Sequence, residues 1–168
     1  MTWSILARDA SGSLGIAIAS RFFAVGALCP YLRSGVGAVS TQALVNPMFG
    51  PRILDALAAG LAPQAAIDDC LAGDEGRTHR QVHVLAFDGT VAAHTGGQCI
   101  DWCGSLRGEN FSVAGNMLAG PQVLQATADA FESHAHRRVR RGHPCSRFPS
   151  FFPATWQRNH AVAFRSWS

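Results

Sequence analysis

Short apolar runs separated by turn residues fill the first 132 positions, and their lengths are typical of β-strands. We predict six strands, over residues 3–8, 14–20, 35–41, 79–87, 90–95 and 111–115. The first two are joined by a turn in which Asp9 and two serines can bond the local backbone and Gly12 can take a positive φ. Asp88 and Gly89 mark a second tight turn, so the pattern predicts two antiparallel hairpins.

Three other segments have the period of a helix. We predict helices over residues 51–59, 62–71 and 121–131. The first two have a proline near the start and a glycine just past the end, which is the usual punctuation of a helix. Because the helices are grouped between runs of strands, the order favours a layered α+β fold with antiparallel sheets. The length of 168 residues corresponds to one domain.

Alternation within the fourth predicted strand assigns its side chains to faces. Val82 and Val84 point to one side, and Gln81, His83 and Leu85 point to the other. We interpret His83 as a histidine packed among strand neighbours rather than as a general base.

The pattern is lost from about Ser133 to the end of the chain. Residues 1–132 hold all eleven acidic residues and seven arginines, a net charge of −4. Residues 133–168 hold the other seven arginines and no acidic residue, a net charge of +7. We therefore divide the chain into a body, residues 1–132, and a basic tail, residues 133–168, that is not a domain. Our hypothesis is that the tail is coding DNA read in the wrong frame, so that it is not the natural C-terminus.

A second interpretation of the tail is an arm that binds nucleic acid or an anionic surface. In that case Arg137, Arg138, Arg140 and Arg141 form a candidate phosphate-binding patch. The other two reading frames of the gene distinguish the two interpretations, because a frame error predicts that one of them continues the last helix.

Composition excludes several kinds of chemistry. All fourteen basic residues are arginine, so no lysine can act as an amine base or form a Schiff base. The number of cysteines is odd and the N-terminus does not resemble a secretory signal, so we expect reduced thiols in a cytoplasmic protein. No apolar stretch is long enough for a membrane span. Cys99, Cys103 and His94 have only loosely metal-like spacing, so we expect no metal and no cofactor.

The residue with the clearest capacity for chemistry is Thr2. Its small side chain allows removal of Met1, and the chain would then begin with a hydroxyl and a free α-amine on one residue. An α-amine with a pKa near 8 can take the hydroxyl proton, directly or through a water molecule, so the pair is a complete nucleophile and base. Many proteins begin Met-Thr, so the context decides: Thr2 opens directly onto a predicted strand, which would hold it in a fixed direction.

Polar residues at other strand ends are further candidates. The first hairpin returns Ser20 and Arg21 towards Thr2, where Ser20 can bond the amine and Arg21 can lower its pKa or bind a carboxylate. Gln42 and Asn46 follow the third predicted strand and can donate to an oxyanion, and Asn116 follows the last strand as a candidate donor. Each also fits an ordinary role in a strand end, loop, cap or turn.

At these residues the body resembles an uncharacterised bacterial and archaeal family, domain of unknown function number 1028. The resemblance covers residues 2–132 and rests on five blocks in order: TWSILARD, GIAIASRFFAVGALCP, GVGAVSTQALVNPMFGPRILDALAAG, RQVHVLAFDGTVAAHTG and GNMLAGPQVL. That family is similar in fold to the N-terminal-nucleophile hydrolases, which implies an αββα sandwich of two antiparallel sheets between helix layers.

The resemblance also implies a mechanism in which Thr2 attacks an amide carbonyl and forms an acyl-enzyme that water hydrolyses. By the resemblance Thr2 is the nucleophile, and Ser20 and Arg21 match a block of the family. Together with the strand-end candidates above, the catalytic candidates are Thr2, Ser20, Arg21, Gln42 and Asn116, and the substrate-binding candidates are Thr41, Asn46 and Arg33. Proteasome-like relatives use a lysine beside the nucleophile, and an arginine has to supply the positive charge here.

We therefore expect an amide-bond hydrolase that acts on a small amide or peptide, forms a homo-oligomer, and binds neither nucleic acid nor membrane. The alternative is a non-catalytic module that binds a ligand or a partner on the same scaffold.

Overall fold

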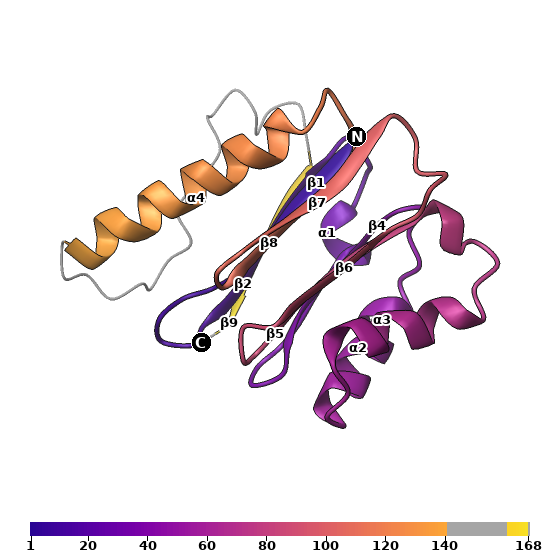
Figure 1. The fold of residues 1–168 in the computed structure, drawn as a ribbon, viewed down its shortest axis with the longest axis horizontal. Helices are drawn as coiled ribbons and strands as arrows, with labels where there is room; N and C mark the ends of the chain where they lie inside the picture. The colour runs from indigo at the N-terminus through magenta and orange to yellow at the C-terminus, as the bar shows by residue number, and fades with distance from the viewer. Residues whose placement is uncertain (141–160, 168) are drawn as a thin grey trace.

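A computed structural model describes the backbone of residues 1–140 and 161–167 and the side chains through Ser133. It contains two stacked antiparallel sheets with helices on both outer faces, so the four layers are αββα, as expected (Figure 1). The first sheet has the order β7-β8-β1-β2-β9, and the second has the order β3-β4-β5-β6.

The strands of the first sheet are β1 (Thr2–Arg8), β2 (Leu14–Ser20), β7 (Trp102–Gly108), β8 (Phe111–Leu118) and β9 (Ala161–Trp167). Those of the second are β3 (Pro30–Arg33), β4 (Gly37–Ala43), β5 (Arg80–Ala86) and β6 (Val91–Thr95). The helices are α1 (Val25–Leu28), α2 (Phe49–Ala58), α3 (Pro63–Ala72) and α4 (Gln122–Arg140), with one 3₁₀ turn, η1 (Arg77–His79).

Alternation along the strands builds three apolar layers. Odd-numbered residues of β1, such as Ile5, pack outwards beneath α4. Val82 and Val84 of β5 share one face, as predicted, and pack outwards beneath α2 and α3. Leu6 and Leu85 face one another between the sheets. The even-numbered residues of β1 therefore point into the space between the two sheets.

Both predicted hairpin turns are confirmed. Gly12 has a φ of +88°, and Asp9 Oδ1 accepts the Ser11 and Ser13 N–H groups at 2.9 Å. In the β5–β6 turn Gly89 has a φ of +94° and Asp88 Oδ1 accepts the Thr90 N–H at 2.8 Å. Positive φ at these glycines costs little, because they have no Cβ.

The last helix is longer than predicted. It runs to Arg140 rather than ending near Phe131, because no proline or glycine interrupts the chain before Gly142. The Phe131 ring packs on Phe111 of the first sheet, with ring centroids 5.2 Å apart. The helix therefore crosses the boundary that the loss of pattern suggested at residue 132.

Three strands and one short helix were not predicted. The strands are β3, β7 and β9, and the helix is α1. β9 lies in the basic tail and extends the first sheet by pairing antiparallel with β2, from Ser20↔Ala161 to Leu14↔Trp167. Residues 161–167 show no clean alternation of apolar and polar side chains, so the sequence did not predict this strand. The division into a body and a tail that is not a domain stays a prediction.

Candidate functional site

Buried polar side chains gather at one end of the space between the sheets. At that end Thr2, Ser20 and Asn116 lie side by side on the inner face of the first sheet, because the Thr2 Cα pairs with Ser20 on one side and Asn116 on the other. The inner residues of the second sheet at the same end are Gln42 and Gln81, which lie opposite one another in the β4–β5 ladder.

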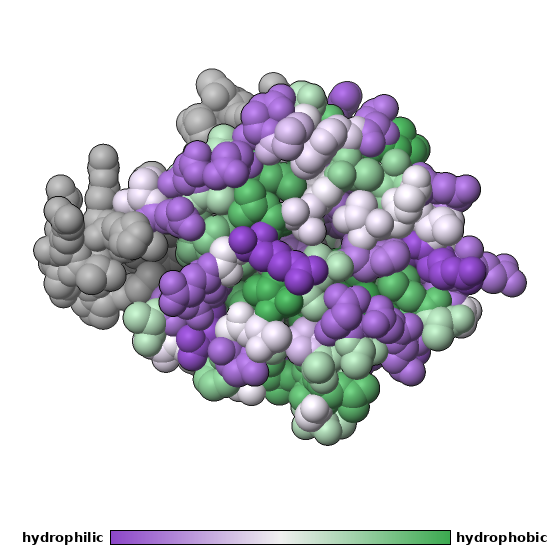
Figure 2. Space-filling view, in the orientation of Figure 1, coloured by the Kyte–Doolittle hydropathy of each residue, from purple (hydrophilic) through white to green (hydrophobic). Residues whose placement is uncertain are grey.

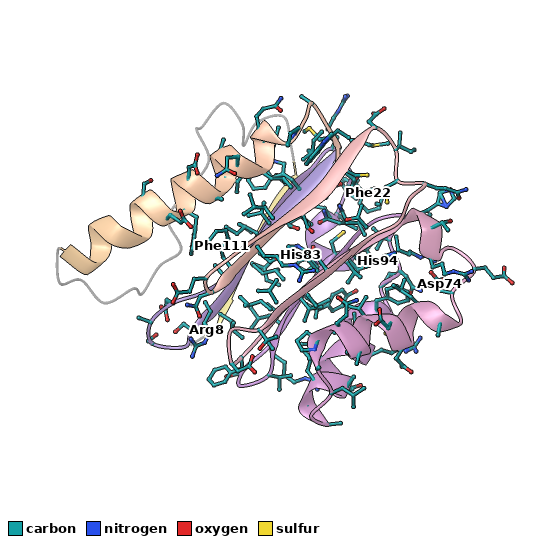
Figure 3. The ribbon with its side chains drawn as sticks, in the orientation of Figure 1. Arg8, Phe22, Asp74, His83, His94 and Phe111 are labelled. Atoms are coloured by element: carbon teal, nitrogen blue, oxygen red, sulfur yellow. The ribbon has the colours of Figure 1, made fainter. Side chains whose placement is uncertain are left out.

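The polar side chains continue inwards as far as Ser112, the ladder partner of Leu6, and then give way to apolar ones. We call the hydrogen-bonded set that crosses between the sheets the intersheet network; it consists of Ser4, Ser40, Gln42, Gln81, His83, Thr95, Ser112 and Asn116. In Figure 3 His83 lies between the two sheets, and Arg8 lies at the end of β1 away from Thr2. The space between the sheets is thus polar at the Thr2 end and apolar further in.

Thr2 and Ser20 form a hydroxyl pair at the outer end of this space. Their Oγ atoms are 2.9 Å apart. The Ser20 hydroxyl donates to the Met1 carbonyl oxygen at 3.1 Å and accepts the Phe22 N–H at 3.0 Å. Because its one proton is used on Met1, Ser20 accepts the Thr2 proton. Thr2 is buried, with 9% of its surface exposed, and its hydrogen bond to Ser20 is buried as well.

The α-amine of Met1 is perturbed by its surroundings. It donates to Met117 Sδ at 3.0 Å. Burial is the main cause that lowers the pKa of this amine, the positive charge of Arg21 lowers it further, and Asp101 opposes both. The chain end at this place therefore has an increased fraction of neutral amine near pH 7.

Gln81 makes the most contacts in the intersheet network. Its Nε2 lies 2.9 Å from the Gly115 oxygen, 3.1 Å from the Gly104 oxygen and 3.0 Å from Thr95 Oγ1. Its Oε1 accepts from Gln42 Nε2 at 2.8 Å and from Asn116 Nδ2 at 3.1 Å. One buried amide therefore joins strands of both sheets.

His83 occupies the inner end of the network. Its Nε2 is 2.7 Å from Ser4 Oγ, which in turn donates to Gln42 Oε1 at 2.7 Å. Its Nδ1 is 2.9 Å from Ser112 Oγ. Complete burial lowers the pKa of His83 to about 3, so the imidazole is neutral. Both nitrogens are occupied, in keeping with a packed histidine.

The structure brings four of the predicted site residues to this end: Thr2, Ser20, Gln42 and Asn116. Arg21 is exposed next to Ser20, close enough to act on the terminal amine. Gln42, however, directs its amide nitrogen to Gln81 and its oxygen to two serines, so both ends of its side chain are used within the network.

The other three predicted residues lie elsewhere. Thr41 is on the face of β4 opposite to Gln42, where its ladder partner Val82 packs beneath the helices. Asn46 accepts the Met48 N–H at 3.1 Å in the loop before α2. Arg33 is at the far end of the second sheet, where it pairs with Asp55 at 2.8 Å.

Sequence reasoning missed five members of the site, which are Ser4, Ser40, Gln81, Thr95 and Ser112. A signal was present, because polar residues recur at every second position of three otherwise apolar strands: Thr2 and Ser4, Ser40 and Gln42, Gln81 and His83. Buried polar residues on one face of a strand need partners, and partners on the facing sheet satisfy them.

Exposed apolar side chains surround the Thr2 end. Phe22 is 49% exposed and follows Ser20, and Met117 is 40% exposed and follows Asn116. Ile100 is also exposed, and its carbonyl accepts the Met117 N–H at 3.2 Å. Figure 3 places Phe22 towards this end of the sheets, and Figure 2 shows apolar areas lying among polar ones on the face in view. A polar interior is thus bordered by an apolar rim, defined as Phe22, Phe23, Leu44, Ile100 and Met117.

The cysteines within the described part of the chain are free thiols: Cys29, Cys70, Cys99 and Cys103. Burial raises the pKa of the Cys29 thiol to about 12, so it is not a nucleophile. Among the residues with described side chains, no three or more His, Cys, Asp or Glu are grouped to hold a metal ion. No helix in that same part is long and apolar enough to cross a membrane.

The fold and the site define an αββα sandwich with a threonine at the start of its central strand. The chain belongs to the family of unknown function DUF1028, whose model matches residues 2–141. The match ends one residue after α4 and nine residues beyond the body that the resemblance covered.

A solved structure of the same family supports the assignment. It is the crystal structure of protein SPO2555 from Silicibacter pomeroyi, with a TM-score of 0.76 and 32% sequence identity. The similarity covers 79% of this chain and 62% of that one, so this chain spans less than two thirds of the length of that protein. A search of curated proteins finds no match.

Proposed function

We propose that the chain is an amide-bond hydrolase of the N-terminal-nucleophile type, in which Thr2 is the nucleophile after removal of Met1. The observation that carries the proposal is the position of the Ser20 hydroxyl. It lies 2.9 Å from Thr2 Oγ1 and 3.1 Å from the carbonyl oxygen of Met1, the group that removal of Met1 deletes.

Removal of Met1 changes the chemistry of Thr2 in two ways. Ser20 loses the acceptor for its proton and becomes free to donate to a new partner. The nitrogen of Thr2 becomes an amine on the same residue as Oγ1, which is the arrangement that an N-terminal nucleophile needs. Burial and, after it, the positive charge of Arg21 lower the pKa of the Met1 amine, and we expect the same surroundings to favour the neutral, basic form of a Thr2 amine.

The reaction then follows from these groups. The amine takes the Oγ1 proton, directly or through water, as Oγ1 bonds to the amide carbon. The carbonyl electron pair moves onto oxygen, where the freed Ser20 hydroxyl is a donor. Collapse breaks the carbon–nitrogen bond, the ammonium proton passes to the leaving amine, and an acyl ester remains on Thr2. Water, deprotonated by the same amine, hydrolyses the ester and restores the site.

The substrate class that fits is a small amide or peptide with an apolar group. The apolar rim around the Thr2 end supports this, because hydrocarbon that leaves water against Phe22 and Met117 contributes about 25 cal/mol for each Å² buried. We also propose that the protein is cytoplasmic and forms a homo-oligomer, whose mass in solution light scattering can measure.

Intact mass of the untagged protein tests the proposal. We expect Met1 to be absent and a panel of small amides and activated esters to leave an acyl adduct on Thr2. Thr2→Ser should keep the adduct, and Thr2→Ala should lose it. Thr78→Ala, at an exposed threonine, is the matched control and should react like the wild type. Active protein that retains Met1 would refute the mechanism.

A second candidate function is a non-catalytic binding module on the same scaffold. The apolar rim favours it too, because exposed apolar patches are typical of interaction surfaces. On this proposal no adduct forms, and Thr2→Ala leaves the biological function intact.

A further inference from the structure

Two backbone carbonyls fix the direction of the hydrogen bonds around Gln81. The Gly104 and Gly115 oxygens can only accept, and both lie within 3.1 Å of one end of the Gln81 amide. That end must be the nitrogen, so the other end is an oxygen. Gln42 and Asn116 both meet that oxygen and must therefore present their nitrogens to it.

The same direction continues from Gln42 to the far end of the network. With its nitrogen on Gln81, Gln42 presents an oxygen to Ser4 and Ser40, so both hydroxyls donate to it. Ser4 has only one proton, so His83 Nε2 must carry a hydrogen and donate to Ser4 at 2.7 Å. A neutral imidazole then has a bare Nδ1, which accepts from Ser112 at 2.9 Å.

We infer that Gln81 is a positioning residue of this site: it sets the direction of the whole intersheet network and holds Asn116 in one orientation beside Thr2. The inference deepens the proposed hydrolase, because Asn116 is the ladder partner of Thr2. With its nitrogen drawn to Gln81, Asn116 has its oxygen left to accept from the new Thr2 amine. Gln81 touches neither Thr2 nor substrate in this role and acts through Asn116.

Gln81→Glu changes which hydrogen bonds residue 81 can donate and leaves the size of its side chain nearly unchanged. It therefore tests the direction of the hydrogen bonds separately from the packing. While the introduced carboxyl group is protonated, it keeps an oxygen for Gln42 and Asn116 and can donate one proton to a carbonyl. Once ionised, it presents a bare oxygen to the Gly104 and Gly115 oxygens. Burial and these carbonyls raise the pKa of the introduced carboxyl above its unfolded value. The variant is therefore least perturbed below that value and loses stability as pH rises through the folded pKa.

The first measurement needs no variant. Nitrogen NMR of the ¹⁵N-histidine-labelled full chain at pH 7 should show His83 as the neutral form with the proton on Nε2. A proton on Nδ1, or a charged ring, overturns the inferred direction.

The second measurement uses Gln81→Glu, with exposed Gln98→Glu as the matched control. Between pH 5 and 8 the Tm of Gln81→Glu should fall relative to wild type, and that of Gln98→Glu should follow wild type. For acylation of Thr2 by p-nitrophenyl acetate, we compare the rate of Gln81→Glu with the wild-type rate at the same pH. This ratio should be about one hundredth at pH 8 and should rise towards one as the pH is lowered. A pH-independent loss of acylation overturns the positioning role.

The outcomes distinguish this inference from the proposed function. If wild-type Thr2 does not acylate, the hydrolase fails, whereas the tautomer of His83 and the pH dependence of Tm still test the direction of the network. If wild type acylates and Gln81→Glu acylates equally well at pH 8, the hydrolase stands and the positioning role of Gln81 is refuted.

Discussion

Ser4→Ala removes only a hydroxyl group, but we expect it to lower the free energy of unfolding substantially. Ser4 Oγ is the acceptor for the His83 Nε2–H and the donor to Gln42 Oε1. Gln42 keeps Ser40 as a second donor, so its oxygen remains satisfied after the substitution. His83 is fully buried, so no solvent reaches the nitrogen that loses its acceptor.

The magnitude follows from that single orphaned donor. Leaving a buried N–H without an acceptor costs about 1–3 kcal/mol. For a chain of this length each kcal/mol lowers Tm by roughly 2–4 °C. We therefore expect Ser4→Ala to lower Tm by roughly 2–12 °C. Ser105→Ala, at an exposed serine in β7, is the matched control and should stay within about 0.5 kcal/mol of wild type.

A double-mutant cycle isolates the contact. Urea unfolding at pH 7, followed by circular dichroism, gives the free energy of unfolding for Ser4→Ala, His83→Leu and the double variant. Once His83 is replaced, Ser4→Ala orphans no imidazole nitrogen, so the double variant should be more stable than the sum of the two losses by about 1–2 kcal/mol. Losses that add within about 0.5 kcal/mol would show that the Ser4–His83 bond does not contribute as argued.

Two further outcomes are expected. The pKa of His83 is about 3 in the folded protein and near 6.5 in the unfolded chain. The free energy of unfolding, measured with urea, should therefore fall by up to about 1.4 kcal/mol per pH unit as the pH is lowered from 6.5 towards 3, beyond any fall that His83→Gln also shows. Equal slopes of the unfolding free energy with pH in the two proteins would contradict this. Deletion of residues 142–168 removes β9 and exposes the edge of β2, so calorimetry should show a lower Tm and light scattering should show a larger mass than that of the wild-type assembly. An unchanged Tm with an unchanged number of subunits would contradict the role of β9.

Local signals in the sequence were enough to predict α2, α3 and the two hairpin turns at Gly12 and Gly89. The prolines and glycines that bound α2 and α3 placed these helices within two residues of their observed ends. Asp88 and Gly89 placed the β5–β6 turn. These features are decided by neighbouring residues, so they do not depend on the rest of the fold.

Pairing across the sheets could not be predicted in the same way. Alternation placed Gln81 and His83 on one face of β5. It could not predict that Ser4 and Asn116 face them from the other sheet. Thr41 and Gln42 were both site candidates, although neighbours in a strand point to opposite faces and only one of them can enter the space between the sheets. β3 and β7 were missed because one is four residues long and the other is a half-exposed edge strand with two glycines.

The pairing of β9 with β2 bears on which sequences this edge of the sheet can accept. The β2–β9 ladder is made of peptide groups, so any extended segment without proline that arrives at this edge with the right reach can complete the sheet. Residues 2–141 follow the family, and the strand that completes the sheet comes from beyond them. A different extended segment joined to residue 141 could therefore occupy the same edge of β2 and leave the pairing of the other strands unchanged.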